Sequence, residues 1–403
     1  MRKQQTKSEL FDVKIEKIVP NGFGLAFAEN RTVFVPLAAE GDRLRVRINQ
    51  TKGKTAFAEI VEILEASPDR IEPRCPYFGR CGGCDFQQLN YEAQMAAKVG
   101  IIRDCLTRIG RINYPKDIPI IGSPREYEYR SRARWHVDSR RKKIGYFQRK
   151  SHDVIDVEVC PILTPALEKT LEEFRQTIEW ETFWSETVEI EAATAGGEVS
   201  VYSTELIEPT REIAFTANGE TYRHDATSFF QGNSFLIKDL INAAVENAGG
   251  ENALDLYCGV GLFTLPLARK FETVIGVEDY GKAIDYAEKN IENARLSNVE
   301  FHLQSVEDFL EDNIENLKNL DFVLLDPPRA GTEKKTIETL LKIEPKFISY
   351  VSCEPSTLAR DLKILTDGNY EIESIVALDL FPQTHHVETV ARLACLQNTK
   401  NSF

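Results

Sequence analysis

The sequence predicts an α/β protein in which a doubly wound C-terminal domain follows a small β-barrel and a central α+β domain. Apolar strand-like runs alternate with helical stretches from about Arg211 onward, as in parallel sheets that are covered on both faces. Short runs with apolar–polar alternation fill residues 8–62, which is typical of small barrels. A chain of 403 residues is long enough for two or three domains.

The barrel is predicted over residues 1–65. The stretch "LRVRI" at residues 44–48 alternates as a half-buried strand does, and turn residues separate it from its neighbours. About five strands of this length fit an oligonucleotide-binding (OB) type of barrel, and an SH3-like barrel fits nearly as well.

The central domain is predicted over residues 66–210. Three prolines in "ASPDRIEPRCP" interrupt regular structure, and the cysteine-rich stretch "CPYFGRCGGC" overlaps their end. The stretch 91–110 then places Met95, Val99, Ile102, Leu106 and Ile109 at helical spacing. This helix is a candidate to pack on the C-terminal domain.

Residues 125–150 form a basic segment with interleaved aromatic residues. It holds ten Lys or Arg against three acids, in a chain whose net charge is −14. That net charge argues against a uniformly basic nucleic-acid binder, but one local surface can still attract RNA. We expect the segment to present cations and aromatic rings such as Trp135 to RNA, and a solvated charged face is the alternative.

The C-terminal domain, over residues 211–403, contains a candidate cofactor turn in "LDLYCGVGLF". Gly259 and Gly261 allow a tight turn and close approach to a ligand. Glu278 ends the next strand nineteen residues after Gly259, where a carboxylate can bind both hydroxyls of a ribose. This form is similar to the S-adenosylmethionine pocket of class I methyltransferases, and NAD binding is the alternative.

Later strand ends place reactive groups at the same rim. Asp326 ends the run "DFVLLD", Cys353 ends "FISYVSC", and Glu388 follows two histidines in "THHVE". A thiolate that adds to C6 of uracil makes C5 nucleophilic toward a sulfonium methyl group. A general base must then remove the C5 proton, so one thiol and one carboxylate meet the needs of this reaction.

These residues stand in motifs that resemble the RNA uracil-5 methyltransferases. The resemblance runs from the barrel to the C-terminus and rests on "CPYFGRCGGCDFQQLNY", "FFQGN", "LDLYCGVGLF", "LLDPPRAG", "YVSCEPSTLARDL" and "FPQTHHVETV". It implies an RNA-binding TRAM domain for the barrel and a class I (Rossmann-like) fold for the C-terminal domain. It also implies that Cys353 is the nucleophile and Glu388 the base. Further pocket positions around S-adenosylmethionine and the target base are Gln231, Tyr257, Glu278 and Asp326. The family usually reads S-C-N-P where this chain has S-C-E-P, so Glu354 would raise the pKa of the thiol unless its side chain points away.

Four cysteines are candidate metal ligands: Cys75, Cys81, Cys84 and Cys160. Their spacing leaves zinc, an iron–sulfur cluster or no metal open, with a modest preference for a cluster. In the family that the chain resembles, matching cysteines hold a [4Fe–4S] cluster.

The function implied is methyl transfer from S-adenosylmethionine to C5 of one uridine, in 23S rRNA. The tRNA T-loop uridine is the alternative substrate, and a catalytically inactive iron–sulfur RNA-binding protein is the alternative function. An exocyclic-amine methyltransferase is disfavoured because Arg329, not an aromatic residue, follows the two prolines. We expect a monomeric cytoplasmic protein, because no stretch is typical of a signal peptide or a membrane span.

Overall fold

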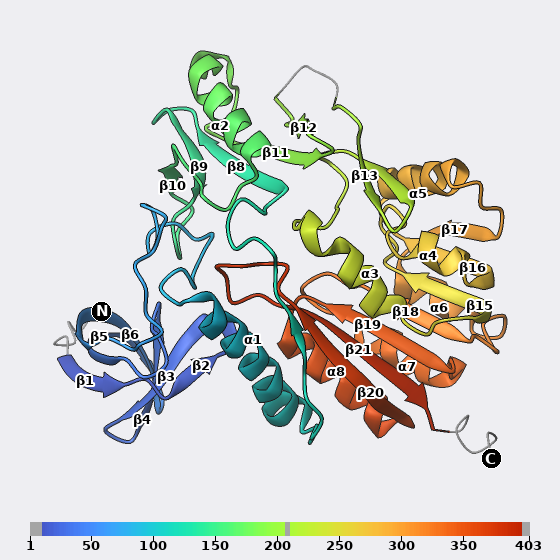
Figure 1. Ribbon diagram of the computed structural model, residues 1–403, viewed down its shortest axis with the longest axis horizontal. Helices are drawn as coiled ribbons and strands as arrows, with labels where there is room; N and C mark the ends of the chain where they lie inside the picture. Colours follow the sequence, from blue (N-terminus) through green and yellow to red (C-terminus); the bar gives the residue numbers. More distant parts are fainter. Residues whose placement is uncertain (1–9, 206–209, 397–403) are drawn as a thin grey trace, which may run out of the picture.

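The computed structural model describes residues 10–205 and 210–396. The elements form a curled N-terminal sheet, a central five-stranded sheet and a large C-terminal sheet (Figure 1). No helix within these residues is long and apolar enough to cross a membrane.

The N-terminal sheet has six strands, not the five that were predicted. Their order is β1 (Leu10–Lys14), β5 (Arg43–Lys52), β6 (Thr55–Glu65), β4 (Arg31–Pro36), β3 (Phe23–Ala28) and β2 (Lys17–Val19). The edge strands β1 and β2 are joined by only two residues, so the sheet curls around its own core, which includes Val33, Leu44 and Val46. No pairing between β1 and β2 is present in the described residues, so a closed barrel is not shown.

The central sheet is covered on one face by α2 (Pro165–Thr177). Its strand order is β10 (Val154–Asp156), β9 (Lys143–Phe147), β8 (Arg132–Asp138), β11 (Thr187–Ala195) and β12 (Glu198–Tyr202). Trp135 of β8 is 0% exposed and packs edge-on against Phe174 of α2. The expectation that Trp135 stacks on RNA was therefore wrong, because its ring belongs to the core.

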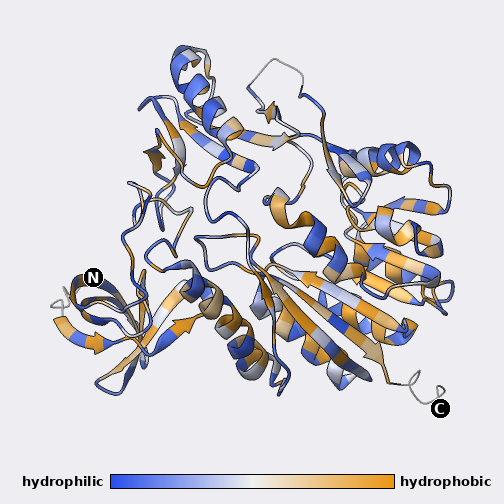
Figure 2. Ribbon diagram, viewed as in Figure 1, coloured by the Kyte–Doolittle hydropathy of each residue, from blue (hydrophilic) through white to orange (hydrophobic). Residues whose placement is uncertain are grey.

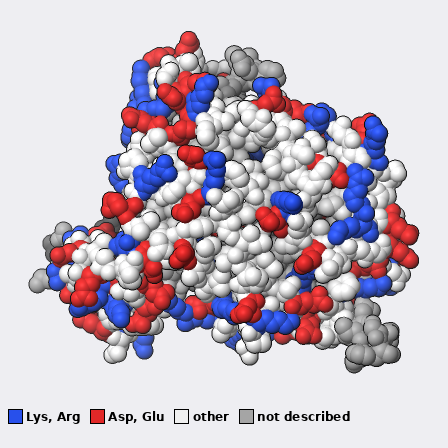
Figure 3. Space-filling model, viewed as in Figure 1, with Lys and Arg blue, Asp and Glu red and all other residues white. Residues whose placement is uncertain are grey.

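The cations of the basic segment are largely paired with local carboxylates. Arg134 contacts Glu191 at 2.8 Å and Lys142 contacts Glu181 at 3.0 Å. In Figure 3 the basic side chains around α2 and β8–β10 alternate with acidic ones and form no single basic area. The alternative of a solvated charged face fits these contacts better.

The C-terminal sheet has eight strands whose central members are mostly apolar (Figure 2). Their order is β17 (Val299–Leu303), β16 (Phe271–Glu278), β15 (Gly250–Leu256), β18 (Phe322–Leu325), β19 (Phe347–Ser352), β21 (Glu388–Cys395), β20 (Tyr370–Leu378) and β7 (Ile120–Ile121). All pairs are parallel except those of β21, which runs antiparallel to β19 and β20. The hairpin of β13 (Ile213–Ala217) and β14 (Glu220–His224) comes before α3 and β15 in the chain and forms a separate two-stranded sheet.

Helices cover both faces of the C-terminal sheet, as predicted for a doubly wound domain. One core contains α6 (Val306–Asn313), α7 (Lys334–Ile343) and α8 (Pro355–Asp367). The other contains α3 (Ile237–Val245), α4 (Thr264–Ala268) and α5 (Gly281–Asn293). With both faces buried, the edges of the sheet where its strands begin and end are the places left for a ligand, and in open α/β sheets the carboxyl-end edge is the usual site.

Helix α1 (Tyr91–Cys105) lies between the curled sheet and α8 (Figure 1). Its buried face includes two polar residues, Gln94 and Lys98, whereas Ile109 of the predicted apolar stripe is 44% exposed. Lys98 forms an ion pair with Asp379, and both side chains are 0% exposed. Lys98 Nζ also donates to the carbonyl oxygen of Phe381 at 3.0 Å. The helix thus holds the loop between β20 and β21 to the rest of the molecule.

We predict that Lys98→Met lowers the free energy of unfolding by about 3–5 kcal/mol, because it leaves the Asp379 carboxylate buried without its partner. Urea unfolding measures this change. The matched control is Lys363→Met, which breaks the exposed pair with Asp367 and should cost at most about 0.5 kcal/mol. Equal stability of the two variants would contradict the prediction.

Candidate active site and cysteine pocket

The candidate catalytic residues lie where β18, β19 and β21 meet. Asp326 directly follows β18, Cys353 directly follows β19, and Glu388 is the first residue of β21. The antiparallel register places Ser352 opposite Thr389, so Cys353 and Glu388 continue that register as cross-strand neighbours. The topology therefore brings the predicted thiol and the predicted carboxylate together.

The electrostatics of this cluster favour protonated groups. Burial, and then the Glu388 charge, raise the pKa of the Cys353 thiol to about 12, although the Arg329 guanidinium opposes both. Burial, and then the charge of Asp326, raise the pKa of Glu388 well above its ordinary value. Burial also raises the pKa of Asp326 to about 7. The three acids share one low-dielectric site, so a cation that enters it favours their ionised forms. Arg329 was not predicted as a site residue, although it directly follows the two prolines.

Glu354, the departure from the family motif, caps a helix. Its carboxylate accepts hydrogen bonds from the backbone N–H of Ser356 at 3.2 Å and from the Ser356 hydroxyl at 2.7 Å. It thereby serves as the N-cap of α8. Burial, and then the charge of Glu354, raise the pKa of Cys105 to about 12. The Glu354 side chain thus bonds to the start of α8, the helix that follows Cys353.

The predicted cofactor turn is built on three residues with positive φ. Tyr257, Gly259 and Gly261 have φ of 63°, 54° and 89°. A side chain at Gly261 would be strained, and its Cβ would lie 3.1 Å from Leu265 Cδ1. The Tyr257 hydroxyl lies 2.6 Å from Thr332 Oγ1, so this residue ties the turn to the loop after Asp326.

Glu278 closes the same turn from the next strand. Its Oε2 accepts a hydrogen bond from Gly259 N at 3.0 Å, and its Oε1 accepts from Asp279 N and Tyr280 N. Burial raises the pKa of the Glu278 carboxyl. This geometry places a carboxylate beside the turn, as a ribose-binding residue requires.

Asp255 was missed in the sequence, although it stands in the same motif. It is 0% exposed, and burial raises its pKa to about 7. Its Oδ2 accepts from the Thr264 hydroxyl at 2.5 Å, and its Oδ1 has no hydrogen-bond partner among the described residues. An unsatisfied buried oxygen beside a glycine turn fits a ligand that brings a donor. Gln231, by contrast, is buried in the loop between β14 and α3, and its side-chain amide makes no hydrogen bond to the described residues.

The loop between β20 and β21 also contacts the cysteine segment. His385 Nδ1 lies 2.5 Å from Asp85 Oδ2, and the backbone N–H groups of Asp85 and Phe86 donate to the carbonyl oxygen of Gln383. Burial lowers the pKa of the neighbouring His386 to about 3. Asp85 directly follows Cys84, so the cysteine segment and the loop before Glu388 are held together.

The four predicted metal ligands line one pocket with Arg130, Tyr146 and other residues. Burial raises the pKa of all four thiols, that of Cys160 to about 12. The charge of Arg130 opposes this change at Cys81, Cys84 and Cys160. Within the described residues, no three or more His, Cys, Asp or Glu side chains are grouped so that they could hold a metal ion. The cluster therefore stays a prediction.

The fold and the site define a class of protein, a class I methyltransferase with an N-terminal accessory domain. A family model described as tRNA (uracil-5-)-methyltransferase matches residues 187–395, and a model for the TRAM domain of tRNA (uracil(54)-C(5))-methyltransferase matches residues 11–68. An RNA methyltransferase of Halalkalibacterium halodurans is 32% identical over 98% of this chain and 99% of its own. The 23S rRNA (uracil(1939)-C(5))-methyltransferase RlmD of Pectobacterium atrosepticum is 31% identical over 94% and 92%.

A solved structure is similar over nearly the whole chain. The tRNA (uracil-54, C5)-methyltransferase of Pyrococcus abyssi, in complex with S-adenosyl-L-homocysteine, superposes with a TM-score of 0.75 at 27% identity, covering 95% of this chain and all of that one. The chain belongs to the family of S-adenosylmethionine-dependent RNA uracil-5 methyltransferases. The predicted enzyme class and the TRAM domain are thereby confirmed.

We predict that alkylation of Cys353 by iodoacetamide accelerates about tenfold per pH unit from about pH 7 to about pH 10, because only the thiolate reacts and its pKa is raised. Peptide mass spectrometry measures the rate at this residue. An unperturbed thiol would stop accelerating near about pH 9. Arg329→Met should slow the reaction further, since it removes the cation that favours the thiolate. A plateau near pH 8 would contradict the assignment of a buried, protonated thiol.

Proposed function

We propose that this enzyme methylates C5 of one uridine in 23S rRNA, with Cys353 as the nucleophile and Glu388 as the base. The observation that supports it best is the position of these two residues as cross-strand neighbours at the rim beside the glycine turn. An inactive RNA-binding protein would not need a thiol, a base and a cofactor turn at one rim.

Different residues of the site bind the cofactor and carry out the addition to uracil. S-adenosylmethionine supplies an electrophilic methyl group and a positive charge. The glycine turn and Glu278 hold its ribose side, and Asp255 offers an acceptor oxygen. The Cys353 thiolate adds to C6 of uracil, which makes C5 the nucleophile that takes the methyl group.

Proton transfer then falls to Glu388. After methylation, its carboxylate removes the proton from C5, and the electron pair of that bond expels the Cys353 thiolate from C6. The raised pKa of Glu388 makes its ionised form a stronger base than an exposed glutamate. Arg329 favours the thiolate state that both the first and the last step require.

The substrate assignment rests on relatives. Two enzymes named for U1939 of 23S rRNA are 30–31% identical over 94% of the chain. The tRNA uridine is the second candidate, because the similar solved structure is named for uridine 54 of tRNA.

We further propose that Cys75, Cys81, Cys84 and Cys160 hold a [4Fe–4S] cluster. All four thiols line one pocket, and an all-cysteine donor set suits such a cluster. Its role would be architectural, because Asp85 next to Cys84 contacts His385 in the loop before Glu388. The cluster would thus fix the cysteine segment that supports this loop.

The proposed reaction predicts a covalent complex with RNA that contains 5-fluorouridine, because fluorine cannot leave C5 as a proton does. A 23S rRNA fragment should be trapped in the presence of S-adenosylmethionine and survive a denaturing gel, whereas a tRNA transcript should not. Trapping of the tRNA alone would transfer the assignment to the second candidate.

Two variants assign the roles in this experiment. Cys353→Ala should abolish trapping, and a complex that persists in this variant would refute the nucleophile. Glu388→Gln should accumulate a methylated adduct on ordinary RNA, because methyl transfer precedes proton removal. Calorimetry with S-adenosylmethionine is the control that both variants keep an intact cofactor site.

The proposed cluster predicts about four irons per chain after anaerobic purification, with a broad absorbance near about 400 nm. Cys160→Ser should lower the iron content, whereas Cys395→Ser, a buried cysteine of β21, should not. One zinc and no iron would overturn the proposal.

A further inference from the structure

A second pocket lies at the opposite edge of the C-terminal sheet from the active site. Its volume is about 450 Å³, within the range of small-molecule sites. The lining includes Phe322 and Phe347, which are the first residues of β18 and β19, whereas Asp326 and Cys353 follow the last residues of these strands. Phe347 and Cys353 are the two ends of a path along the six-residue strand β19, which corresponds to roughly 20 Å. This pocket is therefore distinct from the rim that contains Asp326 and Cys353.

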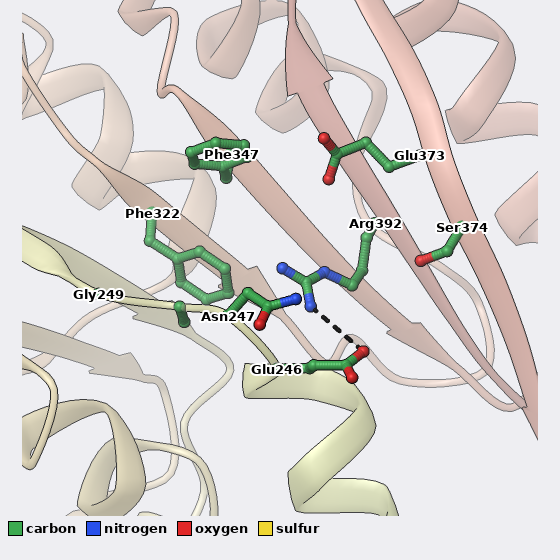
Figure 4. Close-up of a pocket in the computed structure, with 9 residues that line it drawn as sticks. Glu246, Asn247, Gly249, Phe322, Phe347, Glu373, Ser374 and Arg392 are labelled. Atoms are coloured by element: carbon green, nitrogen blue, oxygen red, sulfur yellow. Dashed lines mark ion pairs between the residues drawn. The ribbon is translucent and has the colours of Figure 1, made fainter.

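The pocket contains a buried guanidinium that makes no hydrogen bond to the described residues. Arg392 of β21 is only 9% exposed. Among the described residues its ion-pair partner is the carboxylate of Glu246, at 3.8 Å on a side chain that is 66% exposed (Figure 4). A guanidinium carries five N–H donors, and buried ones are normally satisfied. The donors of Arg392 are thus available to an acceptor that enters the pocket.

Two serines lie beside Arg392 on the neighbouring strands of the sheet. Ser349 of β19 and Ser374 of β20 are both paired with Arg392 in the strand register, so their side chains lie on the same face. Ser374 lines the pocket, and the Ser349 hydroxyl is buried without a hydrogen-bond partner in the described residues. Ser349, Arg392 and Ser374 thus form a polar row across strands that are otherwise mostly apolar. Such a row indicates a site for a polar ligand.

The rest of the lining indicates what kind of ligand fits. Phe322 and Phe347 form an apolar wall, and in Figure 4 the carboxylates of Glu246 and Glu373 lie on either side of the Arg392 guanidinium. A guanidinium binds a carboxylate through two parallel hydrogen bonds. One arginine against two glutamates disfavours a phosphate dianion, whereas a ligand that also carries a cation satisfies both signs of charge.

We propose that this pocket binds a small zwitterion with an apolar side chain, the chemistry of a free apolar or aromatic amino acid. Its carboxylate pairs with Arg392, its ammonium group lies near Glu246 and Glu373, and its side chain packs on Phe322 and Phe347. The site is independent of the methylation chemistry at the other rim.

Ligand-observed NMR titrations of the whole protein test this proposal with L-phenylalanine, L-leucine and L-methionine. At least one of them should bind saturably with a dissociation constant below about 1 mM. For phenylalanine, 3-phenylpropionate lacks the ammonium group and phenethylamine lacks the carboxylate, and each should bind at least about tenfold more weakly. No saturable binding of any of the three amino acids up to about 10 mM overturns the proposal.

Variants locate the site. Arg392→Gln should weaken binding at least about tenfold and leave the affinity for S-adenosylmethionine unchanged. Arg269→Gln, which alters an exposed arginine paired with Glu220, is the matched control and should bind as the wild type does. Phe347→Ala keeps Arg392 and tests the wall separately if the first variant folds poorly. Unchanged binding in both Arg392→Gln and Phe347→Ala overturns the assignment to this pocket.

Discussion

The buried ion pair of Lys98 and Asp379 is the constraint on which the active-site rim depends. It joins a helix of the central segment to the end of β20, and the loop that starts there leads directly to Glu388. Gln94 of the same helix exchanges hydrogen bonds with Gln383 in that loop. Breaking this pair would leave a buried charge without its partner, so the contact stabilises the observed position of the loop. The central segment is therefore part of the catalytic unit, and β7 at the sheet edge strengthens this connection.

The antiparallel strand β21 has the next largest influence on the site. If all strands of the sheet were parallel, the rim that carries the site would be formed only by residues at the carboxyl ends of strands. Because β21 is antiparallel and lies between β19 and β20, its first residue, Glu388, reaches the same rim. There it lies beside Cys353, which directly follows β19. The same strand carries Arg392 to the opposite edge. One element thus serves both the catalytic rim and the second pocket.

The sequence predicted the positions that follow from local rules. Residues after buried strands meet at one rim, so Asp326, Cys353 and the glycine turn were placed together from the pattern alone. The same local rules could not predict which polar and amphipathic side chains are buried by segments distant in the chain. The burial of Lys98 was not predicted, because its partner, Asp379, is 281 residues away in the chain. Trp135 reads as available to RNA because nothing local shows that α2 covers it. The roles of all predicted site residues, from Cys353 and Glu388 to Gln231 and the four cysteines, stay predictions.

The order of the strands also has a consequence during translation. β21 is made after β20 but lies between β19 and β20 in the sheet. A nascent chain that ends at β20 already contains Asp326 and Cys353, yet the place of β21 beside β19 is empty and Glu388 has not been synthesised. Either β19 and β20 stay unpaired until β21 is made, or they pair with each other first. In the second case they must separate when residues 388–395 emerge from the ribosome. In both cases Cys353 and Glu388 meet only after all other strands of the sheet have been synthesised, so a growing chain does not yet hold the two residues together.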